Sequence, residues 1–195
     1  MASLDMPHQK YYLNPIHAVP AYANAEDGVV NMIVEINKGT LTKYEVINET
    51  GMLKVDRVGY SSLVYPFTYG EIPGTWDEDN DPLDIELPYL TEPLVPGCII
   101  EVRVIGIMKF VDSDEIDDKV IGVPNDDKRF DHIKDIKDLP EYFMTETKYY
   151  WEKYKELKKP GTGVVKGFFG KDEALLTINE CIDRYNKDIK PTVQE

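Results

Sequence analysis

The sequence predicts an α+β protein that is mainly β and is organised around a small antiparallel barrel. Short segments that alternate apolar and polar residues, separated by turn residues, occupy the first third of the chain. A long run rich in β-branched residues follows at 98–111, and the residues beyond Pro124 show helical spacing. Strands that come first and helices that come last are typical of an α+β domain.

Three short strands are predicted in the first sixty residues. In the segment 29–36 every second residue is apolar, and Asn37-Lys38-Gly39 supplies a turn. The segments 43–47 and 52–57 have the same period of two and flank a second turn. Three strands joined by tight turns are the pattern of a meander or a small barrel. Beyond an aromatic segment at 63–70 that Pro66 interrupts, strands are expected at 85–90, 98–111 and 120–123.

Two helices are predicted in the last third of the chain. Asp138 and Glu141 have the spacing of a capping box, with Pro140 near the first turn. Apolar and aromatic residues then recur at helical spacing, so this helix is expected to run to about Lys158. A last helix, over about 171–187, carries its apolar residues on one stripe.

Length and composition bound the function. The 195 residues are expected to form a single domain, 1–195, with an irregular lead-in over 1–28 and a polar tail over 188–195. The net charge of −14 argues against binding to nucleic acid or to an anionic membrane. We expect no membrane span and no secretion signal. Cys98 and Cys181 are too few for a disulfide framework, so the expected location is the cytoplasm.

The most informative stretch is 75–85, in which Asp79, Asp81 and Asp84 lead into an apolar segment. This spacing does not suit one helix face, and Pro82 resists a helix, so we expect a loop that feeds a strand. Like charges so close repel each other, and partial protonation or a cation would relieve the repulsion. Carboxylate oxygens suit hard divalent cations, so Mg²⁺ is the first candidate. A solvated acidic surface is the alternative, whereas an EF-hand fits poorly because its downstream Gly and Glu are absent.

A second acidic cluster lies at 112–118, at the end of the long strand. If a barrel brings both clusters to one rim, they offer four or more carboxylates, enough to bridge two divalent cations for displacement at phosphorus. Basic and phenolic side chains that can hold phosphate occur among acidic or apolar neighbours. They are Lys43, Arg57, Lys119, Lys155 and Lys166, with Tyr65, Tyr69 and Tyr154 as neutral donors.

Structural explanations stay open for these residues when each is taken alone. Lys43 can pair with Glu45 at the surface, and Arg57 can pair with Asp56. Tyr154 lies on the apolar stripe of a predicted helix, so it can be a core residue.

The heptapeptide Asp79-Asn80-Asp81-Pro82-Leu83-Asp84-Ile85 resembles the D-x-D-P-x-D motif of the soluble family I inorganic pyrophosphatases, Mg²⁺-dependent enzymes that hydrolyse pyrophosphate. Further matches follow in family order and at close to family spacing, over about residues 29–170. They are Lys43-Tyr44-Glu45, Val55-Asp56-Arg57, Tyr65-Pro66 with Tyr69-Gly70, Asp112 to Lys119, Asp131-His132-Ile133-Lys134-Asp135 and Tyr154-Lys155. Three positions depart from the family pattern: Ser113 stands where many members have Glu, Thr68 replaces a common Asn, and Glu71 replaces an aromatic or apolar residue.

The resemblance implies a role for each matched residue. Asp79, Asp84 and Asp117 resemble the ligands of a first metal ion, and Asp84 also reaches a second. Asp112 and Asp117 resemble the ligands of ions that arrive with the substrate, and Glu45 resembles an outer ligand. Asp81 matches the carboxylate that orients and deprotonates the attacking water. The other implied roles are catalytic for Tyr69, substrate binding for Lys43, Arg57, Tyr65, Lys119, Tyr154 and Lys155, and supporting for Glu35.

By this resemblance the expected fold is a five-stranded OB-like antiparallel barrel with C-terminal helices packed on it. The expected reaction is Mg²⁺-dependent hydrolysis of pyrophosphate to two orthophosphates, in which a metal-activated water attacks phosphorus directly with several Mg²⁺ ions per site. One rival is a hydrolase of organic diphosphates, which would need an aromatic slot for a base. The other is an acidic buffer of divalent cations, which would leave the basic residues without a purpose. Short members of this family are usually hexamers and longer ones dimers, so the resemblance implies a homo-oligomer, with a hexamer favoured and a dimer as the alternative.

Overall fold

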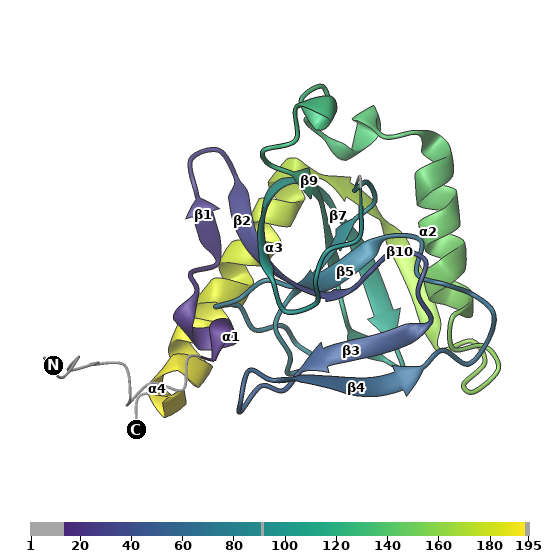
Figure 1. The fold of residues 1–195 in the computed structure, drawn as a ribbon, viewed down its shortest axis with the longest axis horizontal. Helices are drawn as coiled ribbons and strands as arrows, with labels where there is room; N and C mark the ends of the chain where they lie inside the picture. Colours follow the sequence, from purple (N-terminus) through teal and green to yellow (C-terminus); the bar gives the residue numbers. More distant parts are fainter. Residues whose placement is uncertain (1–13, 91, 194–195) are drawn as a thin grey trace, which may run out of the picture.

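Five strands form a closed ring in the computed structural model, which describes residues 14–90 and 92–193 (Figure 1). In order around the ring they are β2 (Val29–Ile36), β5 (Thr68–Glu71), β6 (Asp84–Leu87), β9 (Lys119–Pro124) and β7 (Ile99–Asp112). β7 pairs with both β9 and β2, and the pairing with β2 closes the ring. The predicted class and the five-stranded ring are confirmed. The pairing of β6 with β9 is parallel, a detail that the alternation of residues does not encode.

The strands β3 (Thr42–Val46) and β4 (Leu53–Val58) form a separate two-stranded sheet, and they do not join the ring. The predicted meander through the first three strands is therefore wrong beyond β2. The hairpin lacks the apolar inward face that a ring strand needs, because Lys43 and Arg57 lie opposite each other and line a cleft. Val55 stays exposed. Figure 1 shows the hairpin lying beside the ring.

Three further strands extend the ring. β1 (Tyr22–Asn24) pairs with β2, whereas β8 (Glu115–Ile116) and β10 (Gly163–Gly170) pair with β7. The helix α3 (Lys171–Arg184) packs against β7, and α2 (Glu141–Lys153) packs against β10. In Figure 1 the strands β7 and β10 lie between these two helices, so the helices cover different parts of the sheet.

The core consists of two main hydrophobic clusters. One is aromatic, joins α2 to the ring, and includes Phe67, Tyr150 and Trp151. The other is largely aliphatic, joins α3 to the ring, and includes Ile85 and Ile178. The ring thus has packed residues on both sides.

The first long helix differs from the prediction at both ends. Asp138 does not cap it, because Asp138 belongs to a short 3-10 helix, Ile136–Asp138, where it forms a capping box with Asp135. Pro140, in an extended conformation, precedes α2 and makes no side-chain cap. α2 ends at Lys153 and does not reach residue 158. Leu157 is 76% exposed, so it offers no buried contact that would extend the helix.

The two ends of the described chain are more ordered than predicted. The lead-in contains α1 (Pro15–Ala18) and β1, and the rest of it, 1–13, lies outside the described residues. Asn14 caps α1 with its side chain. After α3 a π-helix, Tyr185–Ile189, leads into α4 (Lys190–Val193), so the predicted polar tail is helical as far as it is described.

None of the helices within 14–90 and 92–193 combines the length and the apolar character that a membrane span requires.

Candidate active site

A single cleft of about 160 Å³ gathers every residue to which the family resemblance assigns a role, except Lys119. We call it the acidic cleft. Lys166, the remaining basic candidate from the sequence, does not line it either. The residues of the acidic cleft come from the ring strands and the segment before β5, from the β3–β4 hairpin and from the loop before β6. Others come from the link between β8 and β9, from α2 and from the segment after α2. The lining residues are Glu35, Lys43, Glu45, Arg57, Tyr65, Tyr69, Glu71, Asp79, Asp81, Asp84, Asp112, Asp117, Trp151, Tyr154 and Lys155.

A tight loop between β5 and β6 positions the first acidic cluster. Asn80 adopts the left-handed conformation, with φ of 67°, which Asn tolerates better than most residues. The backbone N–H of Asp77 donates to the carbonyl of Asp81 at 2.7 Å, and the N–H of Asp81 donates to Asp79 Oδ1 at 3.2 Å. Asp84 is then the first residue of β6. The predicted loop feeding a strand is confirmed.

Asp81 is held by a residue of the β3–β4 hairpin. The amide of Asn48, in the turn of the β3–β4 hairpin, donates to Asp81 Oδ1 at 2.7 Å. Burial raises the pKa of Asp81 above its ordinary value, and the hydrogen bond from Asn48 opposes that shift. Asp81 is therefore an oriented carboxylate with increased affinity for a proton.

Lys119 lies beneath the acidic cleft, where only 1% of its side chain is exposed. Its ammonium group donates to both Asp84 and Asp117, and it lies 5.1 Å from the centre of the Trp151 ring. Burial by itself would lower the pKa of Lys119, but Asp117 and Asp84 raise it above its ordinary value. Lys119 thus joins the two acidic clusters as a permanent cation.

The end of β7 meets the segment that follows α2. The hydroxyl of Tyr154 donates to Asp112 Oδ2 at 3.0 Å, and the ammonium group of Lys155 donates to the same oxygen. Burial by itself would raise the pKa of Asp112, but the hydrogen bonds from Lys155 and Tyr154 hold it below its ordinary value. Tyr154 therefore lines the acidic cleft and also packs against the aromatic cluster.

The hairpin forms the basic wall of the acidic cleft. Lys43 and Arg57 are register partners, and Arg57 also pairs with Asp56 at 2.6 Å. Glu35, from β2, accepts a hydrogen bond from the backbone N–H of Val46 at 2.7 Å and so ties the hairpin to the ring. Burial raises the pKa of Glu35 to about 8, and the positive charge of Lys43 opposes this shift.

The acidic cleft contains more negative charge than its own cations neutralise. Burial, together with Asp84 and Asp117, raises the pKa of Asp79 to about 8. Burial also raises the pKa of Asp84 to about 7, against the opposing effect of Lys119. Within 14–90 and 92–193 no three acidic, His or Cys side chains yet surround one point closely enough to hold a metal ion. The ammonium group of Lys119 pairs with both Asp84 and Asp117, so a metal ion bound by these two carboxylates would compete with it.

Two residues of the acidic cleft were not predicted as site residues. Trp151 lines it from α2 and donates its Nε1–H to the buried Glu86 at 2.6 Å. Glu71 lines it from β5, two residues after Tyr69. The sequence carried a signal for Glu71, because a carboxylate replaces the usual aromatic or apolar residue there. It carried none for Trp151, whose spacing fits an ordinary core position.

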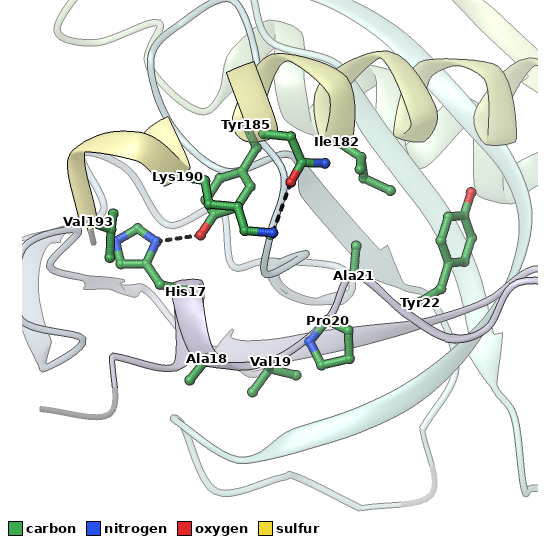
Figure 2. A pocket seen from close by; sticks show the side chains of 12 residues that line it. His17, Ala18, Val19, Pro20, Ala21, Tyr22, Ile182, Tyr185, Lys190 and Val193 are labelled. Atoms are coloured by element: carbon green, nitrogen blue, oxygen red, sulfur yellow. Dashed lines mark hydrogen bonds between the residues drawn. The ribbon is translucent and has the colours of Figure 1, made fainter. Parts of the chain in front are cut away.

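A larger hollow of about 530 Å³ lies elsewhere, between the lead-in and the C-terminal helices (Figure 2). His17 and Tyr185 face each other there, with His17 Nδ1 and the Tyr185 hydroxyl 3.1 Å apart. The side chains around it are mostly apolar, and none of the predicted site residues is among them. This hollow shares no lining residue with the acidic cleft.

Comparisons with known proteins agree with this geometry. The inorganic pyrophosphatase family model matches residues 32–186. The inorganic pyrophosphatase of Geobacillus stearothermophilus is 44% identical over 162 residues, which is 83% of this chain and 97% of that protein. Soluble inorganic pyrophosphatase 1 of Arabidopsis thaliana is 41% identical over 85% of this chain and 77% of that protein.

Solved structures give the same result. The crystal structure of the Thermus thermophilus inorganic pyrophosphatase superposes with a TM-score of 0.82 at 40% identity, covering 89% of this chain and 99% of that chain. The inorganic pyrophosphatase of Neisseria gonorrhoeae has a TM-score of 0.82 at 38% identity, covering 87% of this chain and 98% of that chain. The chain belongs to the inorganic pyrophosphatase family, and it is accordingly an enzyme of the inorganic diphosphatase class.

Proposed function

We propose that the protein hydrolyses inorganic pyrophosphate to two orthophosphates in a Mg²⁺-dependent reaction, by direct attack of water on phosphorus. The observation that carries the proposal is the acidic cleft, which sets carboxylates from two sequence clusters opposite a wall of lysine, arginine and tyrosine. Pyrophosphate is a compact polyanion, so it needs both its charge neutralised and its two phosphates held before an oxygen nucleophile can approach. A cleft of about 160 Å³ suits a small inorganic substrate.

The donor set fits Mg²⁺. The acidic side chains of the cleft offer carboxylate oxygens, the ligands that this ion prefers, and one oxygen of Glu71 is buried with no hydrogen-bond partner among the described residues. Bound Mg²⁺ would neutralise phosphate oxygens and lower the pKa of a bound water. We assign Asp79, Asp84 and Asp117 to a first ion, with Asp84 shared by a second. Asp112 and Asp117 would hold ions that enter with the substrate, and Glu45 would act as an outer ligand.

Asp81 is proposed as the residue that orients the attacking water and accepts its proton. Its carboxylate is fixed by Asn48, so its direction is set before substrate binds. The raised pKa of Asp81, caused by burial, brings its proton affinity closer to the value that suits a general base at neutral pH. Tyr69, which lines the same cleft, is proposed as a second catalytic group, with its hydroxyl hydrogen-bonded to Asp84.

The basic wall is proposed to hold the two phosphates. Arg57 can grip phosphate oxygens through its planar fork, whereas lysines act as point charges. Tyr65 and Tyr154 supply neutral hydroxyl donors. Lys43, Arg57, Tyr154 and Lys155 contact substrate in this proposal, and Lys119 acts from below by fixing Asp84 and Asp117. Glu35 supports Lys43 and anchors the hairpin.

Phosphate release from pyrophosphate, ATP and ADP, each with Mg²⁺ and with excess EDTA, tests the proposal. We expect rapid release from pyrophosphate with Mg²⁺, much slower release from the nucleotides, and none with EDTA. Equal turnover of ATP and pyrophosphate would contradict the substrate assignment. Release that continues undiminished in EDTA would contradict the metal assignment.

We also propose that the chain forms a homo-oligomer, a hexamer in preference to a dimer, works in the cytoplasm, and folds as one domain over 1–195. Light scattering coupled to size-exclusion chromatography measures the assembly. A monomer at micromolar concentration would contradict it.

A further inference from the structure

Glu71 is a buried carboxylate that the reaction as described above does not use. It is only 4% exposed, and its Oε1 is buried with no hydrogen-bond partner among the described residues. It nevertheless lines the acidic cleft. An unpaired carboxylate oxygen shielded from water is unfavourable unless a cation or a donor reaches it. A cation bound at Glu71 Oε1 would therefore stabilise the ionised form of this side chain.

The backbone fixes Glu71 in this place. It ends β5, in register with Asp84 on one side and with Ile33 on the other. The preceding Gly70 packs so tightly that a Cβ atom there would lie 1.9 Å from the carbonyl oxygen of Ile33. Because residues of a strand alternate between faces, Glu71 shares the face of Tyr69, which also lines the acidic cleft. Glu71 cannot turn away to solvent without breaking these pairings.

The neighbours of Glu71 are carboxylates. Burial raises the pKa of Glu71 well above its ordinary value, and Glu35, Asp81, Asp84 and Glu45 raise it further. Three of these neighbours have hydrogen-bond partners: Lys119 for Asp84, Asn48 for Asp81 and a backbone N–H for Glu35. Glu71 instead has a buried carboxylate oxygen with no hydrogen-bond partner among the described residues, and the charges named above as acting on it are all negative.

We propose that Glu71 is an additional ligand, directly or through one bound water, for a divalent cation held between Glu71 and Asp84 in the acidic cleft. The proposal rests on the function given above, because it places the ion among the Mg²⁺ sites of that function. It goes further in assigning a ligand at a position where the family pattern has an aromatic or apolar residue. An added anionic oxygen strengthens cation binding, so this chain holds one of its ions more tightly than the same cleft without Glu71 would.

Metal titration of the substrate-free protein tests this role without measuring activity. The variant Glu71→Gln keeps the shape and removes the charge. Glu86→Gln is the matched control, because Glu86 is a fully buried carboxylate on neighbouring β6 that does not line the acidic cleft. Mg²⁺ binding by calorimetry and Mn²⁺ binding by electron paramagnetic resonance are compared for the wild type and both variants. We expect Glu71→Gln to weaken one binding site about tenfold or more and Glu86→Gln to leave all sites unchanged.

Mg²⁺ and Mn²⁺ affinities of Glu71→Gln equal to those of the wild type would overturn the proposal, since Glu71 would then be a protonated structural group. If the wild type still required Mg²⁺ for hydrolysis while the Glu71→Gln affinities were unchanged, the proposed function would stand and only the role of Glu71 would be wrong. A wild type that binds neither ion would overturn both. If Glu71→Gln fails to fold, Glu71→Asp keeps the charge on a shorter side chain. That variant is expected to bind Mg²⁺ detectably but more weakly than the wild type, and wild-type affinity would contradict the proposal.

Discussion

Single residues in the acidic cleft are already paired before substrate binds: Lys155 donates to Asp112, and Lys119 donates to Asp84. In the proposed function, incoming phosphate competes with Asp112 for the ammonium group of Lys155, and an incoming cation competes with Lys119 for Asp84. When phosphate takes Lys155, Asp112 is released and can bind a cation. We therefore expect the binding of Mg²⁺ and of pyrophosphate to strengthen each other.

Replacing Arg57 or Lys155 with alanine should damage catalysis more than folding. Both side chains line the acidic cleft at partly exposed positions, and removing a phosphate contact weakens substrate or transition-state binding. We expect kcat/KM for pyrophosphate to fall by about a hundredfold, which is about 3 kcal/mol. Arg129→Ala is the control, because Arg129 makes a similar short pair with Asp127 on the surface, outside the acidic cleft. A lower Tm with unchanged kinetics in Arg57→Ala or Lys155→Ala would show that the residue is structural.

Most residues that line the acidic cleft could be named from the sequence. The spacing of Asp79, Asp81 and Asp84 lies within one loop, and the family resemblance supplied most of the others. The burial of Lys119 and the place of Trp151 could not be predicted, because both depend on how β9 and α2 close over the ring. A lysine beside acidic residues has the same sequence pattern whether it faces solvent or lies beneath a cleft.

At the scale of elements, strand positions could be predicted well and their partners less well. The alternation of residues identified β2, β7 and β9 to within a few residues. It could not show that the β3–β4 hairpin leaves the ring, because a strand with one polar face can line a cleft as well as face water. The sequence analysis assigned Asp138 as the cap of the long helix, but Asp138 forms its capping box with Asp135 in the short 3-10 helix that precedes α2.

The pairing of β5 with β2 is predicted to tolerate no side chain at Gly70. In Gly70→Ala the new Cβ would meet the carbonyl oxygen of Ile33 at 1.9 Å, so the strands must separate. We expect a loss of about 3 kcal/mol in the free energy of unfolding, measured by chemical denaturation. In Gly39→Ala no atom beyond the chain neighbours lies within 4 Å of the new Cβ. Only the positive φ of 83° is then unfavourable for alanine, and we expect it to lower the free energy of unfolding by about 1 kcal/mol. Equal losses in the two variants would contradict this close approach.

The whole molecule carries a net charge of −14, and part of that charge is concentrated in buried carboxylates. Burial raises the pKa of Glu86 to about 8, as it does for Glu35 and Asp79. Below about pH 4 these groups are protonated in both the folded and the unfolded chain. Between about pH 4 and 8 the unfolded chain releases protons that the folded chain keeps, so the free energy of unfolding falls as pH rises.

Thermal unfolding in EDTA should therefore show a lower Tm at pH 8 than at pH 5.5. Glu86→Gln should reduce this dependence, because its side chain does not titrate. Added Mg²⁺ should raise the Tm most at pH 8, where the carboxylates are ionised and ready to bind it. A Tm in EDTA that rises from pH 5.5 to pH 8 would contradict the raised pKa values.

Calcium should bind the acidic cleft but support little turnover. Ca²⁺ is larger than Mg²⁺, takes more ligands and tolerates irregular coordination, so it would misplace the water and the phosphate oxygens. We expect Ca²⁺ to inhibit the Mg²⁺-supported hydrolysis of pyrophosphate, as measured by phosphate release with both ions present. If Ca²⁺ alone supported hydrolysis at a rate comparable to that with Mg²⁺, turnover would not depend on the coordination geometry of the ion.

The most direct test of the proposed mechanism is a Mg²⁺ titration of kcat for pyrophosphate with the wild type, Asp84→Asn and Asp81→Asn at one pH. Both substitutions nearly conserve shape and remove one charge. Asp84 is assigned to two ions, so Asp84→Asn should need more Mg²⁺ and recover part of its rate when Mg²⁺ is added. Asp81 is assigned as the base, so Asp81→Asn should stay about 10²–10⁴-fold slow at any Mg²⁺ concentration. Full recovery of Asp81→Asn at high Mg²⁺ with no recovery of Asp84→Asn would contradict the assignment, and wild-type rates in both would place the reaction outside the acidic cleft.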